Sequence, residues 1–174
     1  MDGPLLPLTT TQVAALLRSL PVALHAEAAG LGSDGLRWHP APGEWCVNEV
    51  VGHVIEAERR GFAGRIRDII DGKELDTWDQ EQVARDRNDC ARDGLELLAE
   101  LDALRGEGIR LVEGLAAEQL ALSGMQPDVG ELRVVDLLHE WIHHDRAHLK
   151  QALANVQAYA WPHMGNAQRF SEMG

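Results

Sequence analysis

Apolar residues recur at intervals of three and four along most of this chain, which is the period of a helix with one buried face. In the first such stretch, Val13, Leu17, Leu20 and Leu24 follow this period, and Pro21 is expected to kink or restart the helix. Glycine and proline then separate one periodic stretch from the next. The pattern predicts four long helices and no strand, with the helices over residues 10–29, 46–71, 91–115 and 132–159.

The connections between these helices differ in length. Residues 31–46 are rich in proline and glycine and predict turns, residues 73–90 predict a long polar connection with at most a short helix, and residues 121–131 predict a turn. Four helices with apolar stripes predict an all-α fold, a four-helix bundle, and the long connections allow a crossover topology. We expect one domain over residues 1–160, followed by a loose C-terminal tail at 161–174.

The charge of the chain narrows the possible partners. Sixteen Lys and Arg against 28 Asp and Glu give a net charge of −12, which disfavours nucleic acids and anionic membrane surfaces as partners. The N-terminus lacks the features of a signal peptide, and no apolar run reaches the roughly 18 residues of a membrane span. Two cysteines, Cys46 and Cys90, form no disulfide framework and suit a reducing compartment, so we expect a cytoplasmic protein.

Four of the eight histidines fall between residues 139 and 148, on the last predicted helix. At about 100° per residue, His144 and His148 lie along one edge of its apolar face, whereas His139 and His143 lie on the charged, solvated side. Two imidazoles four residues apart on one face can share a metal ion. Two buried, hydrogen-bonded histidines would fit the same pattern, so the spacing alone leaves both interpretations open.

A third histidine, His53, lies in the middle of the second predicted helix, at the edge of its apolar stripe. Its neighbours on that side, Ala57 and Gly64, are small and would leave room for a ligand. A lone histidine beside an apolar face can equally be structural. The sequence therefore offers His53 as a third metal ligand without requiring it.

Two carboxylates on the second predicted helix have more than one interpretation. Glu58 falls on the apolar face of this helix, and Arg65 lies at a similar angle. One interpretation is an ion pair at a contact between helices or subunits. The other is a carboxylate that orients a ligand or moves a proton. Glu49 precedes His53 by four residues and would orient it in a similar way. Cys46, at the start of the helix, is either a reactive thiol or a partly buried capping residue.

Two segments resemble the DinB/YfiT-like family. The first is PAPGEW at 40–45, followed by Glu49 and His53, and the second is LLHEW at 137–141, followed by HDRAH at 144–148 and Gln151. The likeness extends from about residue 10 to residue 157. Two positions depart from the family pattern, since Cys46 stands where Ser or Thr is usual and Ala147 where a second His is common.

This resemblance implies a four-helix bundle, often a homodimer, that holds one divalent metal ion through His53, His144 and His148. Characterised relatives include thiol-dependent transferases and isomerases that use small thiols such as bacillithiol or mycothiol. We therefore expect Zn²⁺ or Ni²⁺, a low-molecular-weight thiol and a small-molecule substrate, with Glu49 or Glu58 accepting a proton. The alternatives are a metal-dependent isomerase or hydrolase, or a non-catalytic bundle whose metal or dimer interface is structural.

Overall fold

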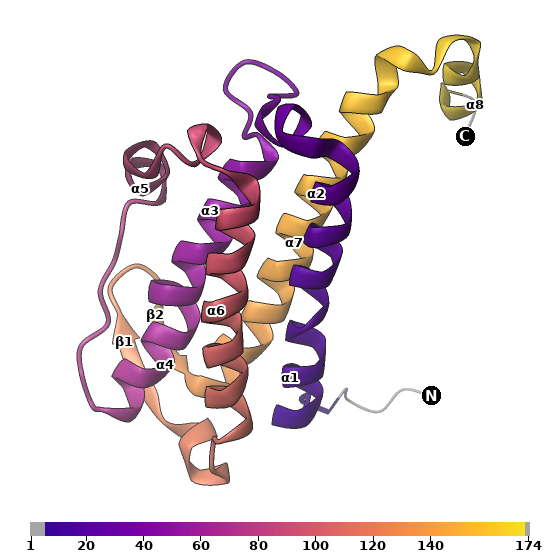
Figure 1. Ribbon diagram of the computed structural model, residues 1–174. Helices are drawn as coiled ribbons and strands as arrows, with labels where there is room; N and C mark the ends of the chain where they lie inside the picture. Colours follow the sequence, from indigo (N-terminus) through magenta and orange to yellow (C-terminus); the bar gives the residue numbers. More distant parts are fainter. Residues whose placement is uncertain (1–5, 173–174) are drawn as a thin grey trace.

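The computed structural model describes residues 6–172 and confirms the all-α bundle. The parts of the predicted domain and tail at residues 1–5 and 173–174 lie outside the described residues. Four long helical stretches run side by side along the bundle (Figure 1), namely α1 (Thr10–Leu17) with α2 (Ser19–Arg37), α3 (Val47–Glu56) with α4 (Ala63–Ile70), α6 (Gly94–Glu113), and α7 (Val134–Ala160).

The first predicted helix is broken one turn earlier than expected. The break falls at Arg18, and Pro21 sits in the first turn of α2, where its missing N–H costs no hydrogen bond. Gly32 interrupts α2 with a φ of 65°, a left-handed conformation that favours glycine, and the helix then resumes as far as Arg37. The predicted turn-rich connection is therefore shorter than expected and covers residues 38–46.

The second predicted helix is continuous but not uniform. A π-helical segment, η1 (Ala57–Phe62), joins α3 to α4. The extra residue per turn in a π segment rotates the following helix face, and such segments are frequent at functional sites. Glu58 lies within this segment and His53 lies just before it.

The connections contain more regular structure than the sequence predicted. The long polar connection holds α5 (Gln80–Arg87) and the short η2 (Asp89–Ala91), and η3 (Ala117–Ala121) follows α6. The prediction of a turn without strands before α7 was wrong, because β1 (Ser123–Gln126) and β2 (Gly130–Arg133) form an antiparallel hairpin. These strands are four residues long and contain no β-branched residue, so they leave little periodic signal.

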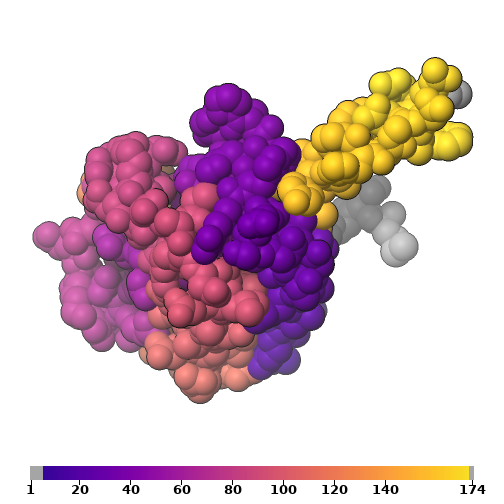
Figure 2. Space-filling view, turned by 45° about the horizontal axis from the view of Figure 1, so that its top comes forward, coloured from indigo at the N-terminus to yellow at the C-terminus, as the bar shows by residue number. Residues whose placement is uncertain are grey.

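Two hydrophobic clusters fill the bundle. One joins α1, η1, α4, the end of α6 and the start of α7, and the other joins α2, α3, the start of α6 and the second half of α7. Beyond α7, the chain continues through η4 (Trp161–His163), η5 (Gly165–Ala167) and α8 (Gln168–Glu172), which project from the body (Figures 1 and 2). Within residues 6–172, no helix is long and apolar enough to cross a membrane.

Candidate metal centre

Three histidines from two helices meet inside the bundle, and we call them the histidine cluster: His53 on α3, and His144 and His148 on α7. One ring nitrogen of each lies within 4.8 Å of the others. The Nε2 atoms of His53 and His144 are 3.0 Å apart. The rings of His144 and His148 lie 4.3 Å apart between centroids, as expected for imidazoles one turn apart on one helical face.

Aromatic side chains fix the orientation of these rings. Trp45 packs against His53 at 5.1 Å, Trp78 stacks on His53 at 6.3 Å, and the edge of Phe62 meets His144 at 5.1 Å between centroids. Trp78 comes from the long connection before α5. That connection therefore covers the cluster.

Burial keeps the histidine cluster in the neutral form. Desolvation, with the neighbouring imidazoles, lowers the pKa of His53 to about 4 and that of His144 to about 3. Burial also lowers the pKa of His148. A neutral imidazole has a free nitrogen lone pair, so at neutral pH all three rings can act as metal ligands without first losing a proton.

The donor set fits one divalent ion. Two ligands of a tetrahedral zinc ion are separated by about 3.3 Å, close to the 3.0 Å between the Nε2 atoms of His53 and His144. Gln151 Oε1 lies 3.0 Å from His148 Nδ1 and would accept a hydrogen bond from its N–H, which leaves Nε2 free for a ligand. The Nδ1 atom of His144 is buried without a hydrogen-bond partner among the described residues, so His144 lacks the orienting contact that Gln151 gives to His148.

A cavity of about 440 Å³ opens beside His53 and His144. Most of its walls are apolar, and Arg65 is the one Lys or Arg among the lining residues. Among the lining residues, Arg65 therefore carries the positive charge that could pair with an anionic group in the cavity. The lining consists of His53, Ala57, Gly61, Phe62, Arg65, Trp78, Gln80, Val129, Leu132, Asp136, Leu137, Glu140 and His144.

Glu58 takes part in a buried charge network, and the predicted ion pair at a helix contact is present, with Arg105 on α6 as its partner and not Arg65. Glu58 Oε1 lies 2.6 Å from Arg105 Nη2 and accepts a hydrogen bond from Trp141 Nε1 at 2.8 Å. Arg105 also donates two hydrogen bonds to Asp145, at 2.5 and 2.8 Å. Arg65 instead reaches the backbone of the connection before α5. The helix wheel placed Glu58 correctly on a buried face but could not identify its partner on another helix.

One cation in this network serves two carboxylates. Arg105, Glu58 and Asp145 are each at most 2% exposed. Because of this burial, the pKa of Glu58 is raised to about 7, although Arg105 and the Trp141 hydrogen bond oppose the rise. The network ties η1, α6 and α7 together next to His144, so it is placed to hold the histidine cluster in register.

Glu49 caps the helix that carries His53 but does not contact that histidine. Its Oε2 accepts a hydrogen bond from Cys46 N at 2.8 Å and lies 3.0 Å from His39 Nε2. The expectation that Glu49 orients His53 is therefore not met in the structure. Cys46 is fully buried at the start of α3, which agrees with its interpretation as a capping residue.

The other two histidines on α7 lie outside the cluster. The His143 side chain is 80% exposed, as predicted. His139 is half-buried instead of solvated, because its Nδ1 pairs with the Val135 carbonyl at 2.7 Å and its Nε2 accepts a hydrogen bond from Leu8 N at 3.0 Å. The N-terminal segment thus covers a position that a helix wheel can only assign to solvent.

The sequence interpretation missed Arg105 and Asp145. Arg105 follows Leu98 and Leu101 on the buried stripe of α6, and a charged residue at such a position is a signal that could have revealed it. Asp145 is adjacent to His144 but belongs to the fully buried face of α7. At about 100° per residue, Asp145 falls in the middle of the apolar face of α7, and a charged residue at that angle is a signal that could have revealed it.

Comparisons with known proteins identify the family and the fold of this chain. The sequence profile of the DinB superfamily matches residues 15–152. YfiT from Bacillus subtilis, described as "a probable metal-dependent hydrolase with an unusual four-helix bundle topology", has the same fold with a TM-score of 0.79. The two chains are 17% identical, over 92% of this chain and 94% of YfiT. No curated protein matches this sequence. The chain belongs to the DinB superfamily.

Proposed function

We propose that this protein is a divalent-metal-dependent enzyme that transfers a small thiol to an electrophilic substrate, with His53, His144 and His148 as the metal ligands. The observation that carries the proposal is the convergence of three neutral imidazoles, two of which, His53 and His144, line an apolar cavity. Three protein ligands leave a coordination position open, as in catalytic sites, whereas structural zinc sites are closed by four. Zn²⁺ and Ni²⁺ both suit imidazole ligands.

A divalent ion bound there would supply Lewis acidity, which lowers the pKa of a coordinated thiol or water. The residues of the chain provide the rest of the chemistry. Phe62 and Trp78 exclude water from the cavity and bind apolar parts of the substrate. Arg65 would pair with a carboxylate of the thiol or of the substrate. We expect the enzyme to act as a cytoplasmic homodimer, as the family resemblance and the two free cysteines predict.

The candidate proton acceptors differ in whether they reach the cavity. Asp136 and Glu140 line the cavity, whereas Glu49 and Glu58 do not. We therefore propose that Glu49 and Glu58 act as positioning residues, one at the start of α3 and one in the buried network. The proton-accepting role expected for Glu49 and Glu58 stays a prediction. Of the two carboxylates that line the cavity, Glu140 is exposed and is the nearer to His144 in sequence.

Hydrolysis is the second candidate reaction, because YfiT is described as a probable hydrolase. The same open position would then take water instead of a thiol. The apolar cavity suits either reaction, so the two differ in the nucleophile and not in the ligands.

The test compares metal-free protein with protein reloaded with Zn²⁺ or Ni²⁺. One assay supplies a panel of thiols with a chromogenic electrophile, and the other supplies chromogenic esters and amides without a thiol. Thiol transfer predicts a metal-dependent rate in the first assay that falls at least a hundredfold in His144→Ala and is unchanged in His143→Ala. A rate in the second assay alone would identify a hydrolase. Metal binding without a rate in either assay would contradict an enzymatic role.

A further inference from the structure

A second group of metal-ligating side chains lies at the end of the bundle where α2 ends and α3 begins. It consists of His39, Cys46, Glu49 and Cys90, which we call the cysteine cluster. One donor atom from each residue lies within 4.8 Å of the others. We propose that the cysteine cluster is a second, structural zinc site, which shares no ligand with the histidine cluster.

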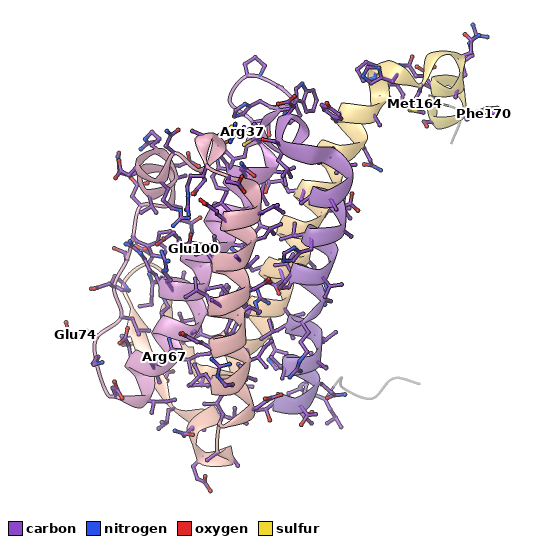
Figure 3. The ribbon with its side chains drawn as sticks, viewed as in Figure 1. Arg37, Arg67, Glu74, Glu100, Met164 and Phe170 are labelled. Carbon is purple, nitrogen blue, oxygen red and sulfur yellow. The ribbon has the colours of Figure 1, made fainter. Side chains whose placement is uncertain are left out.

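The fold brings this cluster together from three separate segments. His39 belongs to the connection after α2, Cys46 and Glu49 form the first turn of α3, and Cys90 lies in η2. Its place in the bundle is marked by Arg37, labelled at the upper end in Figure 3, whose carbonyl accepts a hydrogen bond from Cys90 Sγ at 3.3 Å. An ion bound by ligands from three segments would hold those segments together.

Contacts outside the cluster hold η2 close to α3. The buried Asp89 pairs with Arg87 at 2.6 Å and Arg92 at 3.0 Å. Asn48 Nδ2 donates to the Arg92 carbonyl at 3.0 Å. Gly52 permits this approach, because a Cβ at that position would overlap the Asp89 carboxylate. Cys90, the next residue after Asp89, is therefore carried to Cys46 by contacts that do not depend on the thiols themselves.

A further pair of ionic contacts ties η2 to the neighbouring helices. Arg92 Nη2 lies 2.8 Å from Glu100 Oε2 on α6. Arg87 Nη1 lies 2.7 Å from Glu56 Oε1 on α3. Because these side chains are engaged with η2 and its flanks, the cysteine cluster rests on a pre-formed scaffold, which lowers the entropy cost of binding an ion.

The donor set selects zinc over harder cations. Two thiolates, an imidazole and a carboxylate give four ligands, and thiolates select Zn²⁺ or Cu(I) over Mg²⁺ or Ca²⁺. Two sulfur ligands of tetrahedral zinc lie about 3.8 Å apart, so donors within 4.8 Å of one another need to move by only about 1 Å. On binding, the thiols of Cys46 and Cys90 each release a proton to solvent, and Cys90 gives up its hydrogen bond to the Arg37 carbonyl.

The closed ligand set also defines the role of the site. Four protein ligands leave no coordination position for a substrate, which is typical of structural zinc sites. Cys46 is fully buried, whereas the His39 side chain is 44% exposed, so an ion can enter from the His39 side. The expected effect of zinc is to order the connection between α2 and α3 and to fix η2.

Cobalt(II) is the probe that tests this proposal, because it occupies zinc sites and thiolate ligands give it a charge-transfer band in the near ultraviolet. The full chain, reduced and metal-free, is titrated with Co²⁺ alone. We expect a thiolate band in the wild-type protein, its loss by more than half in Cys90→Ser, and its full retention in His144→Ala. His39→Ala should weaken the cobalt affinity that the band reports by at least tenfold.

Two controls keep the test decisive. Circular dichroism checks that each variant is folded, and Cys90 is half-buried, so its replacement by serine leaves the core intact. Zinc should slow alkylation of Cys90 at least tenfold in the wild-type protein but not in His39→Ala. A reduced wild-type chain that binds cobalt without a thiolate band would overturn the proposal, as would a band that Cys90→Ser leaves unchanged. Because His144→Ala retains this site, a failure here is distinct from a failure of the proposed enzyme.

Discussion

The histidine cluster and the cysteine cluster lie in the same bundle but differ in their donors and in their surroundings. The histidine cluster has three neutral nitrogen donors on two long helices, beside a cavity of about 440 Å³. The cysteine cluster has two sulfurs, one nitrogen and one oxygen, and its residues come from a connection, the first turn of α3 and the short η2. Three ligands beside a cavity suit chemistry, whereas four ligands at the end of the bundle suit the fixing of a connection.

The two clusters also rest on different supports. Beside the histidine cluster, Arg105 bridges Glu58 and Asp145 and joins α6 to η1 and α7. Beside the cysteine cluster, Asp89 docks against Gly52. If the supports are separate, damage to one should impair its own cluster and leave the other cluster able to bind metal.

Loss of the buried cation should have the largest effect. Arg105→Met leaves Glu58 and Asp145 buried without a counter-ion, and removal of one partner from a buried pair costs about 3–5 kcal/mol of unfolding free energy. Urea unfolding of the metal-free protein measures this change. Arg110→Met, an exposed arginine on the same helix, is the control and should stay within about 0.5 kcal/mol of wild type. Equal stability of the two variants would show that the network is not a support.

The unfolding free energy should depend on pH because of Glu58 in the same network. Glu58 has a pKa of about 7 in the folded protein and an ordinary value of 4.5 when unfolded. Between these values the folded state binds more protons, so the contribution of Glu58 to stability falls as the pH rises from 4.5 to 7.

Glu58→Gln removes that titration. We compare the unfolding free energies of wild type and Glu58→Gln with a chelator present. The difference, wild type minus variant, should fall by on the order of 3 kcal/mol as the pH rises from 4.5 to 7. Parallel pH profiles for the two proteins would mean that Glu58 ionises normally.

The packing of Asp89 against Gly52, beside the cysteine cluster, can be disrupted without changing the buried charge network. Gly52→Ala places a methyl group against the Asp89 carboxylate and pushes η2 away from α3, at a cost of about 2–3 kcal/mol. The cobalt–thiolate band should weaken, while zinc binding by the histidine cluster persists. Gly106→Ala, where the nearest neighbour of an added Cβ is the flexible end of Arg110 at 3.5 Å, is the control and should gain about 0.5–1 kcal/mol. An unchanged band in Gly52→Ala would rule out this support.

Removal of Gln151 should have the smallest effect. Its Oε1 accepts from His148 Nδ1 and so holds the ring with Nε2 toward the cluster. Loss of such a partner weakens metal affinity by about tenfold or somewhat more. A zinc competition titration of Gln151→Ala measures the change, with the half-exposed neighbour Leu153→Ala as control. An unchanged zinc affinity would remove Gln151 from the site.

The two clusters differ in how far their residues could be predicted from the sequence. His144 and His148 could be paired from the sequence because both lie on one long helix with a clear apolar period. His53 is 91 positions away from His144, and its part in the cluster followed from family resemblance, since no local pattern fixes the packing of α3 on α7. The cysteine cluster combines position 39 in a connection, positions 46 and 49 at the start of α3 and position 90 in η2, so no single spacing rule could find it.

The same contrast holds for the fold. The four helical stretches could be predicted because their apolar positions repeat over many turns. The hairpin could not, because strands of four residues without β-branched side chains carry no comparable signal. The partners of Glu58 and His139 lie on other segments, Arg105 on α6 and Leu8 near the N-terminus, so they depend on tertiary packing and not on periodicity.

The central claim is that His53, His144 and His148 bind one divalent ion. Its most direct test is zinc binding to Cys90→Ser protein, in which the cysteine cluster is disabled, with a second substitution at either His144 or the neighbouring exposed His143. We predict that His143→Ala/Cys90→Ser binds one zinc ion per chain and that His144→Ala/Cys90→Ser binds zinc at least a hundredfold more weakly. Equal zinc binding by the two proteins would contradict the account.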